Sequence, residues 1–517
     1  MAVKKRKAVG KSQSYASYII DGFVVLILFV FPLFFTDFYY NLHVSKYYFY
    51  IGAVAALLAA LIYAALKKRC HIEKRMIKEM CVTDWAFLIL WLVGLISTCS
   101  SKYVSASFWG NEGRLSGLFL HSLFLIAYFA VTRFGIFRTW YLDIFLVSSL
   151  LVCLFGITDY FDMDILHFKE EISPDHYYIF TSTIGNINFY TAFIAMVTPV
   201  AAVLYSQEAK TKKQVFYYIC YTASLFAIVM GVSDNAILSI GILFALLPLY
   251  LFGKKNGIRK YLILTATFFT VLQCIAWINI YMADRVLGIE SAFNFIMNFK
   301  GLIVITAGLW LLIVLWYGAE FIVKKKLDLY GKIPTALWLA GLLAVFAAAL
   351  FLLYDVNINH NVERYSSLNN YLLLNDDWGT HRGYIWRNAL ECYRDFTPVQ
   401  KLFGYGPDTF GVVMLEKTWN NPYKEIFDSA HNEYLHYLTT FGILGLTAYV
   451  TYLLSFIIKG IRYTEKNPYI AACIFSVICY STQAFVNISN PTVSPVFHLL
   501  VALGILGCRT AKNQKSI

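Results

Sequence analysis

Residues 428–450 read DSAHNEYLHYLTTFGILGLTAYV, a polar loop that runs directly into an apolar helix. The loop places His431 at the mouth of that helix. The stretch closes the only long hydrophilic segment of the chain, about residues 355–432, which carries clustered arginines and the turn Gly404-Tyr405-Gly406-Pro407. A polar loop with several arginines that ends on a histidine at a helix mouth is where we expect the chemistry of this protein.

The rest of the chain has the composition of a membrane protein. Its 517 residues are 59% hydrophobic, 18% aromatic and only 14% charged. Apolar runs of about 17 residues or more recur along it, and each is long enough to cross a bilayer as a helix. Because a backbone in lipid must satisfy its own hydrogen bonds, such runs predict an all-α helical bundle. The fourteen predicted spans, of which at least twelve are expected to be true spans, lie roughly at 19–36, 46–66, 83–99, 115–132, 139–157, 186–205, 215–231, 235–252, 261–280, 301–322, 334–354, 433–458, 468–487 and 494–508.

The distribution of Lys and Arg predicts the orientation of this bundle. The two tails and every second connection hold 30 of the 43 basic residues. Basic connections stay on the cytoplasmic side, so both termini are expected in the cytoplasm and the long loop outside it. The same bias, together with anionic membrane lipid, accounts for the net charge of +12 without a nucleic-acid partner. The apolar run from Ile19 has span length and lacks a small-residue cleavage site, so we expect no cleaved signal peptide.

The chain is expected to form one membrane domain with one inserted loop. The expected boundaries are a cytoplasmic tail at 1–18, helices 1–11 at 19–354, the extracytoplasmic catalytic loop at 355–432, helices 12–14 at 433–508 and a second cytoplasmic tail at 509–517. The ten cysteines are scattered without metal-ligand spacing, which argues against a disulfide framework and a zinc site.

The long loop is predicted to carry short helices over one end of the bundle. Thr380 to Asp395 has the period of an amphipathic helix. Its apolar positions are Trp386, Ala389, Leu390 and Tyr393, and its polar face carries Arg387, Glu391 and Arg394. Pro398 ends the pattern, and Gly404 and Gly406 then supply a turn with permissive backbone angles.

Four helices are predicted to start on the side of the long loop with unusual polar residues. Helix starts expose free N–H groups and the positive end of the helix dipole, which attract phosphate and carboxylate. We therefore expect these starts, with Arg382 and Arg387, to form an anion-binding chamber that extends inward along the line from Arg114 to His121. The four starts are Trp109–Arg114, Gly185–Asn188, Ser233–Asn235 and Ala430–Glu433.

Most of these residues also have a purely structural explanation. Arg114 at a membrane boundary can snorkel to the interface, and His121 inside a span can be a buried hydrogen-bonding group. Arg387 can be a solvated helix residue paired with Glu391, and the asparagines can simply start a helix. Arg382 and His431 are harder to explain in this way, because they bracket the glycine turn and face the same side of the membrane.

The motifs together resemble the O-antigen ligase and polymerase superfamily of bacterial membrane glycosyltransferases. The resemblance covers about residues 84–505, and its specific part is the series from Arg382 through Gly404-Tyr-Gly406 and His431-Asn432-x-Tyr434-Leu435 to Phe441-Gly442-Ile443-Leu444-Gly445-Leu446. The segments Gly110…Arg114-Leu-Ser-Gly117 and Gly185-Asn186-x-Asn188-Phe189 precede it in the same order.

The resemblance implies glycosyl transfer from a polyprenyl-diphosphate-linked glycan, on the outer side of the bacterial cytoplasmic membrane. The acceptor would be a glycan, a lipid, a wall polymer or a protein. Arg382 would bind the diphosphate, with Arg114 as a second clamp, because the planar guanidinium binds phosphate in a bidentate manner. His431 would orient or deprotonate the acceptor hydroxyl, with Glu433 in support. Fixed positive charge can stabilise the leaving group, so no metal and no other cofactor is expected.

The resemblance thus yields two sets of site residues. The candidate catalytic residues are Arg382, His431 and Glu433, and the candidate substrate-binding residues are Arg114, His121, Asn186, Asn188, Arg387, Gly404, Gly406 and Asn432. One feature departs from the family: many members carry a Ser-Arg pair where this chain has Ser233-Asp234-Asn235. Arg285 and Arg364 are the candidates to replace the missing charge.

Other functions are possible on the sequence alone. A lipid-linked oligosaccharide flippase would be expected to show two similar halves around a central cavity, and no such repeat is found. A glycan polymerase of the shape-and-division class uses the same donor, but the His-Asn motif after the loop favours the ligase superfamily. A purely structural protein leaves the placement of Arg382 and His431 without a cause. The sequence does not decide between polymerase and ligase, nor identify the sugar, the linkage or the oligomeric state.

Overall fold

The protein is a polytopic helical membrane bundle. The computed structural model describes residues 15–36, 39–69, 79–111, 113–170, 172–324 and 329–513. In these ranges twelve helices are long and apolar enough to cross a membrane, and the apolar helices Leu118–Phe134 and Asn235–Leu251 are shorter. These elements correspond to the fourteen predicted spans. Several parts of the predicted pattern lie outside the described residues. They are the ends of both tails, the middle of the basic connection after the second span, Glu112 in the 109–114 opening, and residues 325–328.

The described helices follow one another with short connections. They are Tyr15–Leu33 (which includes η1, Leu26–Val30, and α2, Phe31–Leu33), η2 (Tyr39–Asn41), α3 (Leu42–Leu66), α5 (Val82–Ser100), α6 (Val104–Trp109), α7 (Leu118–Phe134), α8 (Trp140–Tyr160), η3 (Pro174–Ile179), α9 (Ile187–Gln207), α10 (Thr211–Met230), α11 (Asn235–Leu251), α12 (Gly257–Tyr281), η4 (Ala283–Arg285), α13 (Phe293–Met297), α14 (Leu302–Val323), α15 (Lys332–Asn357), η5 (Glu363–Leu368), α16 (Asn369–Leu372), α17 (Trp378–Asp395), α18 (Pro398–Phe403), α19 (Phe410–Thr418), α20 (Glu433–Ile461), α21 (Pro468–Gln483), η6 (Ala484–Val486) and α22 (Ser494–Asn513).

A minimal hairpin is the only β-structure in the described part of the chain. The strands β1 (Phe180–Thr181) and β2 (Gly185–Asn186) pair antiparallel ahead of α9. They form in the connection that precedes the predicted 185–188 helix start, and they hold that start in place.

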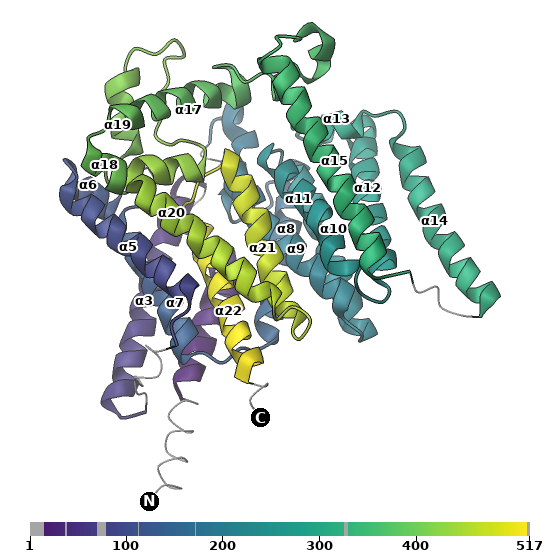
Figure 1. The fold of residues 1–517 in the computed structure, drawn as a ribbon, viewed down its shortest axis with the longest axis horizontal. Helices are drawn as coiled ribbons and strands as arrows, with labels where there is room; N and C mark the ends of the chain where they lie inside the picture. The colour runs from purple at the N-terminus through teal and green to yellow at the C-terminus, as the bar shows by residue number, and fades with distance from the viewer. Residues whose placement is uncertain are drawn as a thin grey trace, which may run out of the picture.

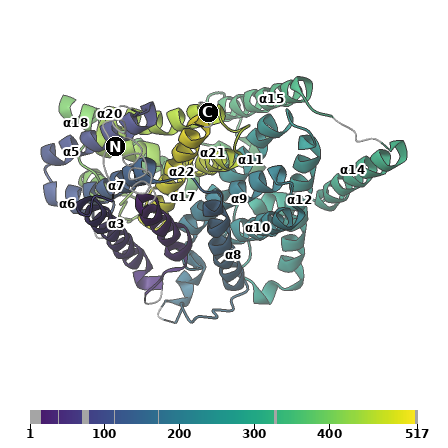
Figure 2. The same ribbon diagram turned by 90° about the horizontal axis from the view of Figure 1, so that it is seen from below.

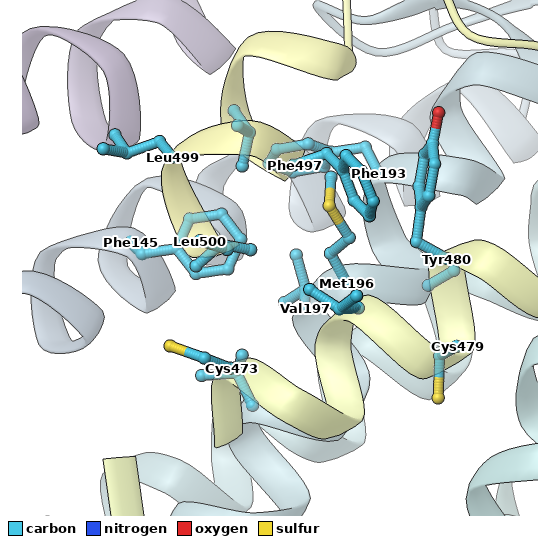
Figure 3. Packing of buried hydrophobic residues seen from close by; sticks show 14 of the residues in the cluster. Phe145, Phe193, Met196, Val197, Cys473, Cys479, Tyr480, Phe497, Leu499 and Leu500 are labelled. Carbon is cyan, nitrogen blue, oxygen red and sulfur yellow. The ribbon is translucent and has the colours of Figure 1, made fainter. Parts of the chain in front are cut away.

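The centre of the bundle is formed by α8, α9, α21 and α22. Figure 3 shows their side chains packed together, with Phe193 and Met196 of α9 lying close to Tyr480 of α21 and Phe497 of α22. All four of these residues are at most 1% exposed. The helix α9 carries apolar residues on all of its faces, which is the pattern of a helix buried in the middle of a membrane protein.

The long loop folds into helices that cap one end of the bundle. In Figure 1, α17, α18 and α19 lie together across this end, which we call the loop end. The predicted amphipathic helix is α17, which buries Ile385, Ala389 and Cys392. Leu390 was expected on the buried face but is 52% exposed, because the face that packs on α19 is centred on Ala389 and Cys392 rather than on Leu390.

Close backbone contact joins this cap to α20. Gly442 breaks the regular helix with φ +69°, and a Cβ there would lie 2.4 Å from the Leu402 carbonyl oxygen. A Cβ on Gly404 would lie 2.1 Å from the carbonyl oxygen of Thr440. The N–H groups of Tyr405 and Gly406 donate to carbonyls of α20. Only glycine allows both the backbone angles and the close approach, so the Gly-x-Gly turn docks the cap.

The opposite end of the bundle is held by a buried charge cluster around Asp84. Asp84, at the start of α5, is completely buried. It accepts hydrogen bonds from Tyr128, from the N–H of Cys81 and from Arg133 and Arg509, the last at 2.7 Å. Because these groups come from α5, α7 and α22, the cluster ties the three helices together.

The helices α14 and α15 lie at the periphery. In Figures 1 and 2, α14 stands apart at one edge of the bundle. Their membrane windows are only 11% and 0% buried within the chain, although they are among the most apolar of the described helices. Apolar helices with so few protein contacts are suited to face lipid.

Candidate active site

Two cavities lie at the loop end. The larger, about 1850 Å³ including its open mouth, is lined by Arg382 of α17, Asp234 before α11 and residues of α13 and α16. We call it the cleft. The smaller, about 430 Å³, is lined by Arg114 and by residues of α7 and α20 that include His121, Glu433 and His436. We call it the chamber. The cleft has ample room for a ligand, whereas the chamber is narrow and has free space for little more than a water molecule.

Arg114 lies on the wall of the chamber, but its charge is already paired. Its Nε and Nη2 donate to the two carboxylate oxygens of Asp428 at 2.9 and 2.7 Å. Burial disfavours the charged form of Asp428, but the hydrogen bonds and charge of Arg114 outweigh it and hold the pKa of this carboxyl below its usual value. The pair fixes the segment just before His431, and it leaves Arg114 less able to act as an anion clamp.

A second buried carboxylate organises the loop that carries Arg114. Asp408 follows the glycine turn, and its Oδ2 accepts the N–H groups of Asn111 and Ser116 at 2.7 and 2.9 Å. Burial raises the pKa of Asp408 to about 6, against the effect of these two N–H groups. Gly404 and Gly406 therefore contribute by placing Asp408 and docking the cap, and neither glycine lines the chamber or the cleft.

Arg382 has an incompletely satisfied guanidinium. Its Nη1 donates to the Gly379 carbonyl at 2.9 Å, while its buried Nε has no hydrogen-bond partner among the described residues. Burial lowers its pKa, against the charge of Asp234. The three residues before it, Gly379 to His381, all have positive φ, including Thr380 at +59°. A β-branched residue in this region is strained, and such strain is concentrated at functional sites.

His431 lines neither cavity, but it interacts electrostatically with an arginine from the wall of each. The charges of Arg114, on the chamber wall, and Arg382, on the cleft wall, both act on it. Burial and then these two charges lower the pKa of His431 to about 4, although Asp428 opposes the shift. The ring is therefore neutral near pH 7, and it makes no hydrogen bond to a described residue. His431 itself has φ +44°, the left-handed region that non-glycine residues seldom adopt.

The first turns of α20 form one wall of the chamber. Glu433 is 3% exposed, and its Oε1 accepts from the Tyr449 hydroxyl at 2.6 Å. His121 of α7 reaches the same chamber, where its Nδ1 lies 3.0 Å from the Gly117 carbonyl. Asn432 lines neither cavity; it caps α20, because its side chain accepts the N–H of Leu435.

Two of the predicted helix starts, Gly185–Asn188 and Ser233–Asn235, are joined to each other by their polar side chains. Asn186 caps α9 by accepting the N–H of Asn188. The Asn188 side chain accepts from Ser233 at 2.6 Å, and its carbonyl accepts from Asn235 and Asn487. These bonds join α9 to the start of α11. Asp234, which stands where the resemblance led us to expect an arginine, lines the cleft.

The remaining loop arginines lie away from both cavities. Arg387 forms an ion pair with Asp376 at 2.6 Å and a longer one with Glu391. Arg394 pairs with Asp395, and Arg364 lies 4.0 Å from Asp355 with 71% of its side chain exposed. Arg285 is in the exposed turn η4. Within the described ranges, Arg382 is therefore the one cation on the wall of the cleft.

Sequence reasoning missed three residues of this site, namely Asp408, Asp428 and His436. Asp428 opens the stretch that ends the loop, yet no local pattern shows that it meets Arg114, which lies 314 positions earlier. Asp408 follows Gly406-Pro407, and an acidic residue directly after a glycine turn was the sequence signal that could have marked it as a site residue. His436 lies within the apolar span that follows His431, and nothing in the local sequence marks it as part of a site. No cluster of three metal-ligating side chains is found in the described residues.

Comparison with known families adds to this geometry. Residues 291–450, which hold the cleft wall, the loop helices and the start of α20, match the family described as O-Antigen ligase. This match supports the resemblance of the chain to the O-antigen ligase/polymerase superfamily. It supports a role as a surface-polysaccharide ligase or polymerase, that is, a glycosyl-transferring enzyme of the membrane. A comparison with curated proteins gives no match.

Proposed function

We propose that this protein transfers a glycan from a polyprenyl-diphosphate donor to an acceptor hydroxyl at the loop end, outside the cytoplasmic membrane. The observation that carries the proposal is the pair Arg382 and His431. Arg382 lines a large cleft and has a buried N–H without a partner among the described residues, and His431 is a histidine that burial and the charges of Arg114 and Arg382 keep neutral by lowering its pKa. An arginine and a neutral imidazole are the groups that a departing diphosphate and an attacking hydroxyl require.

The transfer is a displacement at the anomeric carbon of the donor sugar. The acceptor oxygen forms a bond to this carbon, and the bond from the carbon to the diphosphate oxygen breaks. Arg382 binds the diphosphate and stabilises the negative charge that develops on it. His431 accepts a hydrogen bond from the acceptor hydroxyl and orients it, and the hydroxyl proton leaves toward His431. Fixed charge does this work, so the reaction needs no metal.

Donor binding and base strength are coupled in this arrangement. Without substrate, the charge of Arg382 helps to hold the His431 pKa near 4. Burial contributes most to the lowered pKa of His431 and would remain, but a diphosphate bound to Arg382 would cancel part of the charge of Arg382 and raise that pKa by the part that this charge contributes. His431 therefore becomes a somewhat better proton acceptor when the leaving group is in place. The acidic residue Asp234 keeps the apo cleft from accumulating positive charge.

The experiment is a reconstituted transfer assay. Lipid-linked glycan is extracted from host cells that lack this chain and is mixed with the purified full-length protein in detergent, with and without EDTA. A ladder of longer glycans identifies a polymerase, and a product that forms only after a second acceptor is added identifies a ligase. Unchanged lipid-linked glycan under every condition would refute the proposal, and a loss of activity with EDTA that Mg²⁺ restores would refute metal independence.

A further inference from the structure

The loop that carries Arg382, residues 377–383, has an unusual backbone. We call it the Arg382 loop. Gly379, Thr380 and His381 all lie in the left-handed region, with φ of +62°, +59° and +66°. Residues other than glycine visit this region singly rather than in runs, because their Cβ crowds the following carbonyl oxygen. A strained run of this kind persists only when the surrounding structure holds it in place.

The base of the Arg382 loop is closed by backbone contact. The N–H of Tyr384 donates to the Asp376 carbonyl at 3.0 Å. A Cβ on Gly383 would lie only 1.8 Å from the Asn375 carbonyl oxygen, so the two arms of the loop can come this close only with glycine at this position. These contacts join the ends of the loop and leave its strained middle to be held by other residues.

Tyr423, which does not line the cleft, supplies this support. Its hydroxyl donates to the Asp377 carboxylate at 2.7 Å, and its ring stacks on the His381 ring with the centroids 3.7 Å apart. The Nδ1 atom of His381 also lies 3.3 Å from the Glu425 carboxylate. Of the three strained residues, His381 alone does not line the cleft. Tyr423 and His381, which we call the clamp, therefore hold the loop from the side that faces away from substrate.

The residue that supports the loop is itself fixed. The buried side chain of Asn421 accepts the N–H of Tyr423 at 3.0 Å and donates to the Glu425 carbonyl at 2.7 Å. The edge of Tyr384 packs on the Tyr423 ring, with the centroids 5.3 Å apart. The same stretch of chain continues to Asp428, which is paired with Arg114. Tyr423 thus stands on a closed turn that is tied to the rest of the site.

We propose that Tyr423, with His381 stacked on it, is a positioning residue for the donor. The clamp keeps the Arg382 loop in its strained form and so keeps the guanidinium of Arg382 on the wall of the cleft. The inference rests on the proposed function, in which Arg382 binds the donor diphosphate. Without the clamp the loop would relax toward right-handed backbone angles, and Arg382 would spend only part of its time in the binding position.

Hydrogen–deuterium exchange on the purified full chain tests the clamp without requiring activity. Tyr423→Ala should speed amide exchange over residues 377–384 about tenfold, because it removes a hydrogen bond and a ring contact, and should leave residues 387–395 of α17 unchanged. Tyr423→Phe keeps the ring contact and should show a smaller increase. Tyr393→Phe is the matched control, because the Tyr393 hydroxyl also donates one hydrogen bond within the cap, to the Lys401 carbonyl, away from the loop.

A kinetic measurement then separates positioning from general stability. Tyr423→Ala should raise the KM for the lipid-linked donor about tenfold, because only the held fraction of the loop binds donor, and Tyr423→Phe should recover part of this loss. The value of kcat should change less, since bound diphosphate itself holds Arg382 in place. A general loss of folded protein would instead lower the apparent kcat and leave KM unchanged.

The two measurements fail separately from the proposed function. The clamp is refuted if residues 377–384 of Tyr423→Ala exchange at the wild-type rate, or if this variant keeps the wild-type donor KM. Absence of transfer by the wild type would refute the proposed function, while the exchange measurement still decides whether Tyr423 holds the Arg382 loop.

Discussion

Asp84 and Glu433 are two buried carboxyls near the starts of membrane helices, at opposite ends of the bundle, and their surroundings differ. Asp84 has partners on both oxygens, including two arginines from other helices. Glu433 accepts a hydrogen bond from Tyr449. The Asp84 carboxylate is satisfied on both oxygens, as expected of a group that holds helices together, although the buried Nε of Arg509 has no partner among the described residues. In the described part of the chain, the Glu433 carboxyl has no arginine partner, and besides Tyr449 only the Tyr480 hydroxyl interacts with it.

The arginines repeat this difference. Arg133 and Arg509 donate to Asp84, and at the loop end Arg114 is fully paired with Asp428. Arg382 and Arg509 each keep a buried Nε without a partner among the described residues. What sets Arg382 apart is that it makes no ion pair with a described carboxylate and lines the cleft, so it is the arginine that we assign to substrate.

The largest effect should come from breaking the cluster around Asp84. Asp84→Ala leaves Arg133 and Arg509 without their shared carboxylate, and removing one partner of a buried ion pair costs about 3–5 kcal/mol. We expect a large drop in thermal unfolding temperature, measured on the purified protein in detergent. Glu433→Gln keeps the hydrogen bond to Tyr449 and should unfold close to the wild-type temperature. Equal losses in the two variants would remove the distinction between the two ends.

The next effect should come from Arg382. Arg382→Ala should lower the rate of transfer by about 10²–10³-fold, the usual cost of losing a group that stabilises a developing negative charge. Arg382→Lys should restore only part of the rate, because a lysine cannot bind the diphosphate in a bidentate manner. Near-wild-type transfer and donor affinity in Arg382→Ala would contradict its role, provided that the protein still folds.

His431 should follow with a somewhat smaller effect. His431→Ala should lower the rate of transfer about 100-fold, which is the lower end of the rate effects usual for a positioned general base. We expect the lower end because His431 in the free enzyme is a weak base. Folding and membrane insertion should be unchanged. Full transfer activity in this variant would show that another group handles the acceptor hydroxyl.

The pH dependence gives a further and milder test. With a pKa of about 4, His431 of the free enzyme stays neutral as the pH falls from 8 to 5. A histidine at its usual pKa near 6.5 would lose its neutral form about tenfold per unit below pH 6. The value of kcat/KM, which reports the free enzyme, should therefore show no fall from this group until the pH approaches 4. A fall centred near pH 6.5 that disappears in His431→Ala would contradict the lowered pKa.

The smallest effect should come from replacing Arg394, an arginine on α17 that serves as the control for Arg382. Arg394 of α17 has 75% of its side chain exposed and pairs only with its neighbour Asp395. Exposed ion pairs contribute about 0–1 kcal/mol, so Arg394→Ala should leave transfer and stability almost unchanged. A loss in this variant as large as that of Arg382→Ala would mean that charge on α17 in general, rather than Arg382 in particular, is required.

The sequence allowed the fold to be predicted because span length and the period of α17 are local properties. His431 and Arg382 could be singled out for a similar reason, since each stands next to a local motif. The pairing of Arg114 with Asp428 could not be predicted, because it joins residues that are 314 positions apart. The same holds for Asn188, whose partners come from α11 and from the segment before α22. His436 could not be singled out because it lies within an apolar span, whereas the chamber that it lines is completed by α7 and by loops distant in the sequence.

The most direct test of the account is the fate of the donor lipid in proteoliposomes. The protein is reconstituted with lipid-linked glycan, and free polyprenyl diphosphate is measured alongside the glycan product for the wild type and for Arg382→Ala. The account predicts release of one polyprenyl diphosphate for each glycan transferred by the wild type, and almost none by the variant. Movement of intact lipid-linked glycan across the bilayer without release of polyprenyl diphosphate would contradict it and would indicate a flippase.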